Sequence, residues 1–220
     1  MMTERFIHHV GLERPSATET PAEARTRLGA KFPRTALRRM THLGLLTGAA
    51  LDGLPLTAED AIVYATTFAE TRALEDYLTS FPAASPLLFQ TSIHPSAVQQ
   101  VLIGRQQPIR RFWPMTGRRR LTESALQAAL METAPRVVLA GGEERGTWLL
   151  EQSMASATSF AFALLLTAES AGARGRVRFQ PVAGAAETPV PTLEEFTLAL
   201  AERKPLAWSG AGGAWTIAWL

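Results

Sequence analysis

Three short, almost wholly apolar runs constrain the fold of this chain most strongly. They are AIVYATT at 61–67, RVVLAGGEE at 136–144 and SFAFALLLTAE at 159–169. A strand that is apolar on both faces belongs inside a sheet that is covered by helices on each side. Because helical segments separate these runs, the pattern predicts a layered α/β domain.

The helical segments show apolar residues at three- and four-residue intervals, as one buried helix face requires. We expect helices over residues 33–53, 71–79, 96–103, 121–132 and 192–203. Thr122 and Thr192 are the expected N-caps of the last two, because a threonine side chain accepts a hydrogen bond from a free backbone N–H of the first turn.

Four further segments are strand-like and complete the expected order of elements. They cover residues 1–10, 108–113, 176–182 and 214–220. Residues 184–191 read as a linker. We therefore divide the chain into a main domain over 1–183 and a short C-terminal helix and strand over 184–220, packing on the same domain.

Composition excludes several classes of protein. The formal net charge of +2 is too small to indicate binding to nucleic acid or to a membrane surface. The longest apolar run, Phe160–Leu166, is too short to span a bilayer. The segment before Pro21 lacks the layout of a signal peptide. We expect a cytoplasmic protein that does not insert into membranes.

The chain contains no cysteine, which excludes disulfides, thiolate metal sites and thiol catalysis. Four histidines are present, and no pair of them has a ligand-like spacing with a carboxylate. His42 lies on a predicted helix whose buried face is already supplied by leucines. No metal site is expected.

Five segments stand in the order and spacing of a known family. They are RRM at 38–40, AIVYATTFAE at 61–70, SPLLFQTSIHPSA at 85–97, RVVLAGGEE at 136–144 and SFAFALLLTAE at 159–169. Together they resemble the N-terminal half of β-ketoacyl synthases, in the thiolase superfamily, and above all the short ketosynthase-like chain length factors of aryl polyene type clusters. The resemblance implies a thiolase-like half, a layered αβα fold with a mixed sheet, with the second half truncated.

The resemblance also places the family's nucleophilic cysteine at about Thr116, counting back from Ala140 or forward from Gly104. A threonine offers no thiolate. Ketosynthases take both catalytic histidines from the second half of the fold, and residues 170–220 contain no histidine. The chain is therefore expected to run no condensation on its own and to bind no cofactor.

With the family's cysteine and both catalytic histidines missing, the resemblance implies a non-catalytic subunit. It would form a heterodimer with a full-length β-ketoacyl synthase and help to set acyl or polyene chain length in fatty-acid or polyketide-type biosynthesis. The growing chain would arrive on the phosphopantetheine of an acyl carrier protein. The residues expected to gate chain length are Leu87, Leu88, Phe89, Phe112 and Trp113.

Two surfaces are assigned by the same resemblance. The dimer interface would contain an edge strand that pairs antiparallel with its counterpart, and its residues are Ile109, Arg110, Arg111 and Phe112, with His94 as buried structure near the seam. Arg118, Arg119 and Arg120 would dock an acidic carrier protein by electrostatic attraction. A solvated rim, or arginines paired at the interface, is the open alternative for these three.

Two other functions stay open at this point. One is a stand-alone thiolase-fold decarboxylase or acyltransferase that uses the hydroxyl of Thr116 or Ser124 as nucleophile. The other is a scaffold that binds carrier protein without any ketosynthase.

Overall fold

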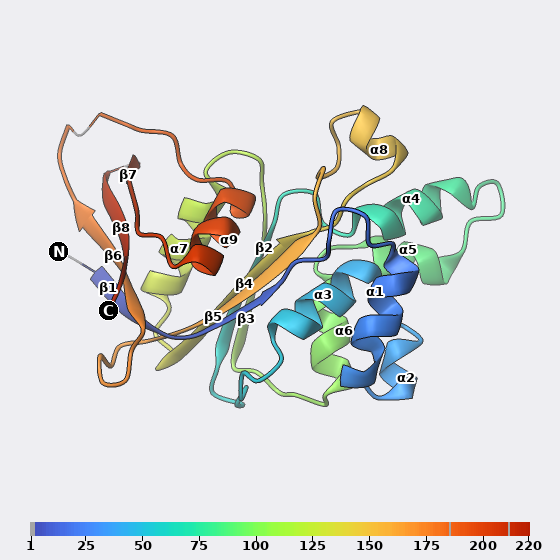
Figure 1. Ribbon diagram of the computed structural model, residues 1–220, viewed down its shortest axis with the longest axis horizontal. Coiled ribbons are helices and arrows are strands. Elements are labelled where there is room, and N and C mark those ends of the chain that lie inside the picture. The colour runs from blue at the N-terminus through green and yellow to red at the C-terminus, as the bar shows by residue number, and fades with distance from the viewer. Residues whose placement is uncertain (1–2, 185, 211) are drawn as a thin grey trace.

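One mixed sheet forms the centre of the molecule in the computed structural model, which describes residues 3–184, 186–210 and 212–220 (Figure 1). The strands are β1 (Thr3–Glu13), β2 (Ala61–Thr66), β3 (Arg111–Thr116), β4 (Arg136–Glu143), β5 (Phe160–Thr167), β6 (Gly175–Pro181), β7 (Leu206–Gly210) and β8 (Gly213–Trp219). Their order in the sheet is β3-β2-β4-β5-β1-β6-β8-β7. β2 is parallel to β3 and β4, and every other pair is antiparallel. The predicted α/β fold with a mixed sheet is confirmed.

Helices cover both faces of the sheet. They are α1 (Pro21–Leu28), α2 (Arg34–Leu37), α3 (His42–Ala50), α4 (Thr71–Thr79), α5 (Pro86–Ser92), α6 (Ser96–Gly104), α7 (Leu121–Met131), α8 (Trp148–Glu151) and α9 (Leu193–Glu202). α3 and α6 pack on one face with α1 outside them, and α7 and α9 pack on the other (Figure 1). None of these helices, within the described ranges, has the length and apolar character needed to cross a membrane.

The apolar runs serve two cores at once, because successive side chains of a strand point to opposite faces. Val63 and Ala65 of β2 belong to the core beneath α7 and α9. Ile62 and Tyr64 belong to the core beneath α3 and α6. This double burial is the physical reason why the run at 61–67 contains almost no polar residue.

The helical stretch predicted over 33–53 is wrong, since two helices occupy this stretch. α2 ends at Leu37, and the chain turns before Thr41 caps α3. The Thr41 hydroxyl accepts from the Gly44 N–H at 3.1 Å, and the Thr41 N–H donates to Gln100 Oε1 at 2.8 Å. These two bonds satisfy backbone groups that a continuous helix would have used internally.

The two predicted N-caps have opposite outcomes. Thr192 caps α9 in a reciprocal box with Glu195, whose carboxylate accepts the Thr192 N–H at 2.8 Å. Thr122 is not a cap, because α7 begins at Leu121 and its N-cap is Arg120 in the left-handed region at φ +57°. The Thr122 side chain is buried, and its hydroxyl has no hydrogen-bond partner within the described residues.

The C-terminal segment extends the main sheet. β8 lies between β6 and β7, and the indole of Trp208 on β7 stacks on Trp215 of β8 at 5.8 Å. β7 was not predicted, because its short sequence LAWSG lacks a strand-like alternation and contains residues that strands disfavour. β3 begins three residues later than the predicted segment 108–113.

Candidate functional site

The turn from β3 to α7 is where the family resemblance places a catalytic thiol. Thr116 is the last residue of β3, opposite Thr66, and its side chain is exposed. Ser124 is exposed on α7. Within the described ranges no hydrogen bond joins either hydroxyl to a base, so neither has the activated arrangement that a nucleophile needs.

A cavity of about 370 Å³ lies beside this turn, between the first residues of α7 and of α9. Glu143 and Thr122 both line it. The Glu143 carboxylate accepts from Thr66 Oγ1 and from the Phe68 N–H, each at 3.2 Å. Burial nevertheless raises the pKa of Glu143 to about 7. The cavity thus holds a carboxyl that exchanges a proton near neutral pH, but no nucleophile bonded to it.

β3 leaves one edge of the sheet open. It pairs with β2 along one side, and no strand of the described chain pairs with its other side. An edge with unpaired N–H and C=O groups is a template for a strand of another chain. The open edge belongs to β3, the strand that the sequence predicted as the dimer interface.

The side chains of β3 divide between the two faces of the sheet. Phe112 is half-buried and packs against the core beneath α3 and α6, as does Ile109 just before the strand. Trp113 faces the other way, is 48% exposed, and donates from Nε1 to Glu132 Oε2 at 2.8 Å. Phe112 and Trp113, both predicted gate residues, therefore do not form one wall.

The arginines next to this edge have partners within the chain. Arg111 Nη1 lies 2.9 Å from Glu132 Oε1, and Arg110 Nη1 lies 3.3 Å from Glu59 Oε2. Both partners of the Arg110 pair are exposed, so this pair contributes little to stability, whereas Glu132 of the Arg111 pair is buried.

The remaining predicted gate residues lie on α5, in a hairpin that projects from the domain with α4 (Figure 1). Leu87 is 60% exposed, Phe89 is 50% exposed, and Leu88 is half-buried. The Phe89 ring contacts Tyr77 at 5.3 Å. We call the exposed residues of this hairpin the apolar hairpin surface; they are Leu78, Phe81, Leu87, Phe89 and Ile93. Contiguous exposed apolar side chains mark interaction sites.

His94 directly follows Ile93 in the chain, and its side chain is partly buried. Its ring stacks on Tyr64 at 5.6 Å, and Nδ1 is 4.0 Å from Glu70 Oε2. Burial lowers the pKa of His94 to about 4, and burial raises the pKa of Glu70 to about 8. At neutral pH a neutral imidazole therefore faces a protonated carboxyl.

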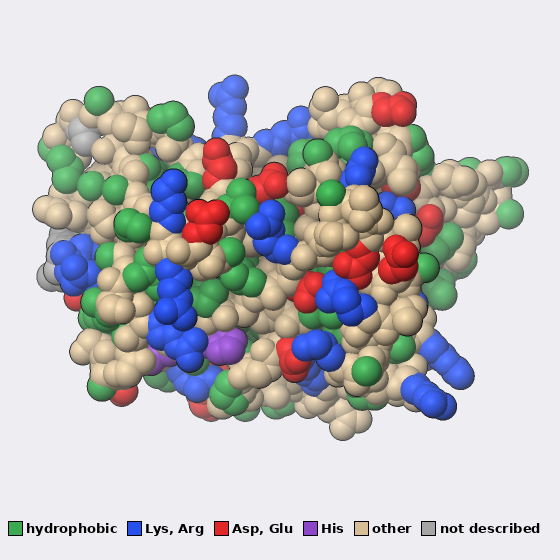
Figure 2. All heavy atoms as spheres, in the orientation of Figure 1, with side chains coloured by type: hydrophobic (Ala, Val, Ile, Leu, Met, Phe, Trp, Pro, Cys, Tyr) green, Lys and Arg blue, Asp and Glu red, His purple; other side chains and the backbone are tan. Residues whose placement is uncertain are grey.

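Two of the three arginines predicted to dock a carrier protein are engaged within the chain. Arg118 donates to the Ser153 carbonyl at 2.8 Å and lies over the Phe68 ring at 5.3 Å. Arg120 bonds Glu123 and Glu187. Arg119 is exposed. Figure 2 shows basic and acidic side chains interspersed over the face in view, not one basic patch.

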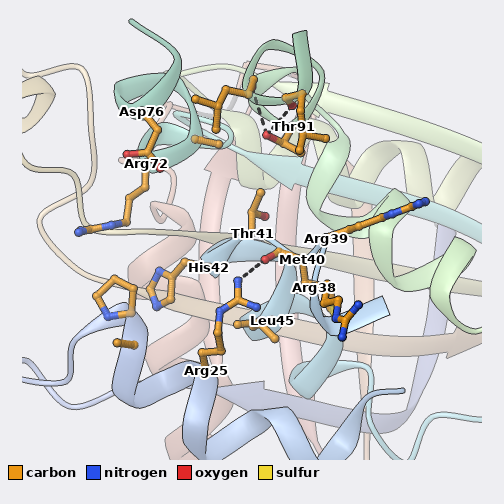
Figure 3. Close-up of a pocket in the computed structure, with 15 residues that line it drawn as sticks. Arg25, Arg38, Arg39, Met40, Thr41, His42, Leu45, Arg72, Asp76 and Thr91 are labelled. Carbon is orange, nitrogen blue, oxygen red and sulfur yellow. Dashed lines mark hydrogen bonds between the residues drawn. The ribbon is translucent and has the colours of Figure 1, made fainter. Parts of the chain in front are cut away.

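Sequence reasoning missed a second cavity of about 450 Å³ between α1, α3, α4 and α5 (Figure 3). Leu87 and Leu88 line it, together with His42. His42 Nδ1 lies 3.2 Å from Glu144 Oε2, although the two residues are 102 positions apart. The paired acids at the end of β4, Glu143 and Glu144, were the local signal for it. In the described residues no three histidine, aspartate or glutamate side chains are grouped as metal ligands.

No protein-family model and no curated protein matches this chain. Solved structures do match. A chain of the complex between the ketosynthase ApeO and its chain length factor ApeC from Xenorhabdus doucetiae aligns with a TM-score of 0.67 and 17% identity, over 97% of this chain and 98% of that one. The chain has a ketosynthase-like fold.

Two further structures carry the same ketosynthase-like fold. The ishigamide ketosynthase/chain length factor aligns at a TM-score of 0.58 and 15% identity, over 81% of this chain and 67% of that chain. A β-ketoacyl synthase from Burkholderia phymatum STM815 aligns at 0.54 and 14%, over 93% and 70%. At these identities the likeness shows the fold, and the predicted thiolase-like architecture is confirmed at that level.

Proposed function

We propose that this chain is a non-catalytic ketosynthase-like subunit, a chain length factor, that pairs with an active β-ketoacyl synthase. The observation that carries the proposal is a ketosynthase-like fold over nearly the whole chain in a sequence without any cysteine. The thiol that forms the acyl-enzyme must then come from the partner. The two exposed hydroxyls near the turn give no support to a stand-alone acyltransferase.

The open edge of β3 and the apolar hairpin surface form the proposed interface. Strand pairing across β3 would satisfy its free backbone groups, with Ile109, Arg110 and Arg111 beside the seam. Covering the hairpin would remove large exposed rings from water, at roughly 25 cal/mol per Å² of apolar surface. Exposed apolar residues on this hairpin support a protein partner rather than a hydrated loop.

Chain length would be set where the partner's acyl chain reaches α5. Each methylene that enters an apolar tunnel gains about 0.8 kcal/mol, until a side chain blocks the path and overpacking costs more than burial returns. Leu88 and Phe89 are the residues of α5 that we propose as this block. Phe112 and Trp113 remain predictions, on opposite faces of β3.

An acyl carrier protein is the second proposed partner, since it would deliver the acyl chain on phosphopantetheine. Arg118 and Arg119 are both exposed, but Arg118 already donates to the Ser153 carbonyl, so docking at this cluster would rest mainly on Arg119. A role in aryl polyene or related polyketide biosynthesis in the cytoplasm completes the proposal.

Co-expression with a full-length β-ketoacyl synthase tests the pairing. We expect a stable heterodimer by size-exclusion chromatography with light scattering. A chain that stays monomeric in the presence of the synthase would refute the proposal. Release of carbon dioxide from malonyl carrier protein by this chain alone would instead support the stand-alone enzyme.

The gate is tested in the assembled pair. Leu88→Ala or Phe89→Ala should lengthen the products while turnover is retained, as read by mass spectrometry of released chains. Ile103→Ala, at an exposed apolar residue of α6 outside the hairpin, is the matched control and should leave product length unchanged. If all three variants give the same product lengths as the parent protein, α5 does not set chain length.

A further inference from the structure

The cavity between α1, α3, α4 and α5 joins an apolar surface to an excess of positive charge (Figure 3). Its volume of about 450 Å³ lies within the range of small-molecule sites. Met40, Leu45, Leu87 and Leu88 supply the apolar wall.

Four arginines and one acidic residue line the same cavity. The arginines are Arg25, Arg38, Arg39 and Arg72, and the acid is Asp76. This excess of positive charge in a concave site attracts anions.

The guanidinium groups differ in how many hydrogen bonds they already donate within the chain. Arg25 is held in place, because its two Nη atoms donate to the carbonyls of Leu37 and Met40 at 2.6 Å each. Arg38 and Arg39 are exposed and have no acceptor among the described residues. In Figure 3, Arg25 lies centrally, and Arg39 and Arg72 extend to opposite sides. Both uncommitted groups keep all five N–H donors for a ligand.

His42 adds a polar atom to the cavity wall. Glu144 Oε2 accepts from the Leu43 N–H at 3.1 Å and meets His42 Nδ1 at 3.2 Å, while Oε1 accepts from the Arg72 N–H at 2.8 Å. Since a carboxylate only accepts, Nδ1 carries the hydrogen. His42 Nε2 is then left without a partner in the described chain, although the side chain is only 8% exposed. A ligand atom would satisfy this buried nitrogen.

We propose that this cavity binds an organic anion, a carboxylate or phosphate on a short apolar chain. Arg38 and Arg39 hold the anionic group by charge-assisted hydrogen bonds, and the apolar chain packs on Met40, Leu45 and the leucines of α5. His42 Nε2 bonds a polar atom of the ligand. The proposal stands independently of any pairing with a synthase.

Isothermal titration of the full chain tests the ligand class with four probes: decanoate, decyl phosphate, decan-1-ol and inorganic phosphate. We expect saturable one-to-one binding of an anionic amphiphile. The uncharged alcohol and inorganic phosphate should each bind about tenfold more weakly or worse, because each lacks one half of the recognition. Preference for decyl phosphate indicates a phosphorylated ligand, and preference for decanoate indicates a free acid.

Matched variants locate the site. The double variant Arg38→Gln with Arg39→Gln should weaken anion binding by about tenfold or more. Arg14→Gln with Arg34→Gln removes the same charge from exposed positions outside the cavity and should leave affinity nearly unchanged. Ala22→Trp, on the cavity wall, should block binding while the circular dichroism spectrum stays that of the parent.

Three results would overturn the proposal. They are no saturable binding of either anion, equal binding of decan-1-ol, and equal loss in both arginine double variants. Because these titrations use the chain alone, their failure leaves the test of heterodimer formation unaffected.

Discussion

Three acidic side chains, Glu70, Glu143 and Glu144, are buried at or just beyond the carboxyl ends of β2 and β4. Each accepts hydrogen bonds from backbone N–H groups of neighbouring segments. Glu70 accepts from Ala97 at the start of α6 at 2.7 Å, and Glu144 bridges the first turns of α3 and α4. At the scale of single residues, these carboxyls bind the backbone of helix starts and of the loop after β2 at the strand ends, which explains why ionisable groups occupy such buried positions.

Glu70 should make the protein less stable at alkaline pH. The unfolded chain loses this proton near the ordinary pKa of 4.5, whereas the folded protein keeps it to about pH 8. The folded state binds more protons in that window, so the free energy of unfolding falls as pH rises. His94, with a pKa of about 4, acts in the opposite direction only up to its ordinary value of 6.5.

Urea unfolding measures this effect. Between pH 6.5 and 8.5 we expect a loss on the order of 2 kcal/mol, and Glu70→Gln should remove the larger part of it, because Glu143, with a pKa of about 7, contributes the rest. Glu59→Gln, at an exposed carboxyl, should keep the parent's pH dependence. A parent protein whose stability does not change over this range would contradict the prediction.

At the scale of elements, the two threonines predicted as N-caps show that a residue's N-cap propensity is realised only where the surrounding backbone allows it. Thr192 closes a capping box on α9, while Thr122 lies inside the first turn of α7 with an unsatisfied hydroxyl. The residue before α7, Arg120, takes the left-handed conformation, which no threonine-based cap pattern anticipates.

Their substitutions should therefore differ in sign. Thr192→Ala should cost about 1 kcal/mol, because the α9 first turn loses its acceptor. Thr122→Val keeps the shape and removes a buried unpaired hydroxyl, so it should be neutral or slightly stabilising. Chemical denaturation of both variants checks this, and a clear loss of stability in Thr122→Val would show that its hydroxyl has a partner in solution.

At the scale of the whole molecule, one sheet joins the N-terminal and C-terminal parts of the chain. β1 pairs with β5 on one side and with β6 on the other, and β6 pairs with β8. Trp208 and Trp215 belong to the same core as α7. This continuity favours one cooperative unit over two separately folding domains.

Calorimetry should accordingly show a single unfolding transition. Trp208→Ala should cost about 3–5 kcal/mol and lower the midpoint of that one transition. Trp148→Ala, at a 41% exposed ring on α8, is the control and should shift it little. A second transition that moves alone in Trp208→Ala would show that residues 184–220 unfold separately.

Much of the architecture was predictable, because a buried strand or helix face leaves a characteristic spacing of apolar residues in the sequence. The run at 61–67 had to be a central strand, and α4 over Thr71–Thr79 follows from its apolar spacing. The break at Thr41 was not predictable, because it depends on Gln100, which lies on another helix. For the candidate site, the sequence pointed to α5 and β3, but the location of Phe112 and Trp113 on opposite faces depends on the strand's register.

The sequence by itself determined the α/β class, the buried strands and the absence of any thiol, since each is a property of composition or of short-range periodicity. Only the tertiary structure decided which edge stays open, which arginines are engaged, and that His42 meets Glu144 at the wall of a cationic cavity. The physical reason is range. Strand and helix signals repeat within a few residues, whereas these contacts join side chains that come close only after the sheet has assembled.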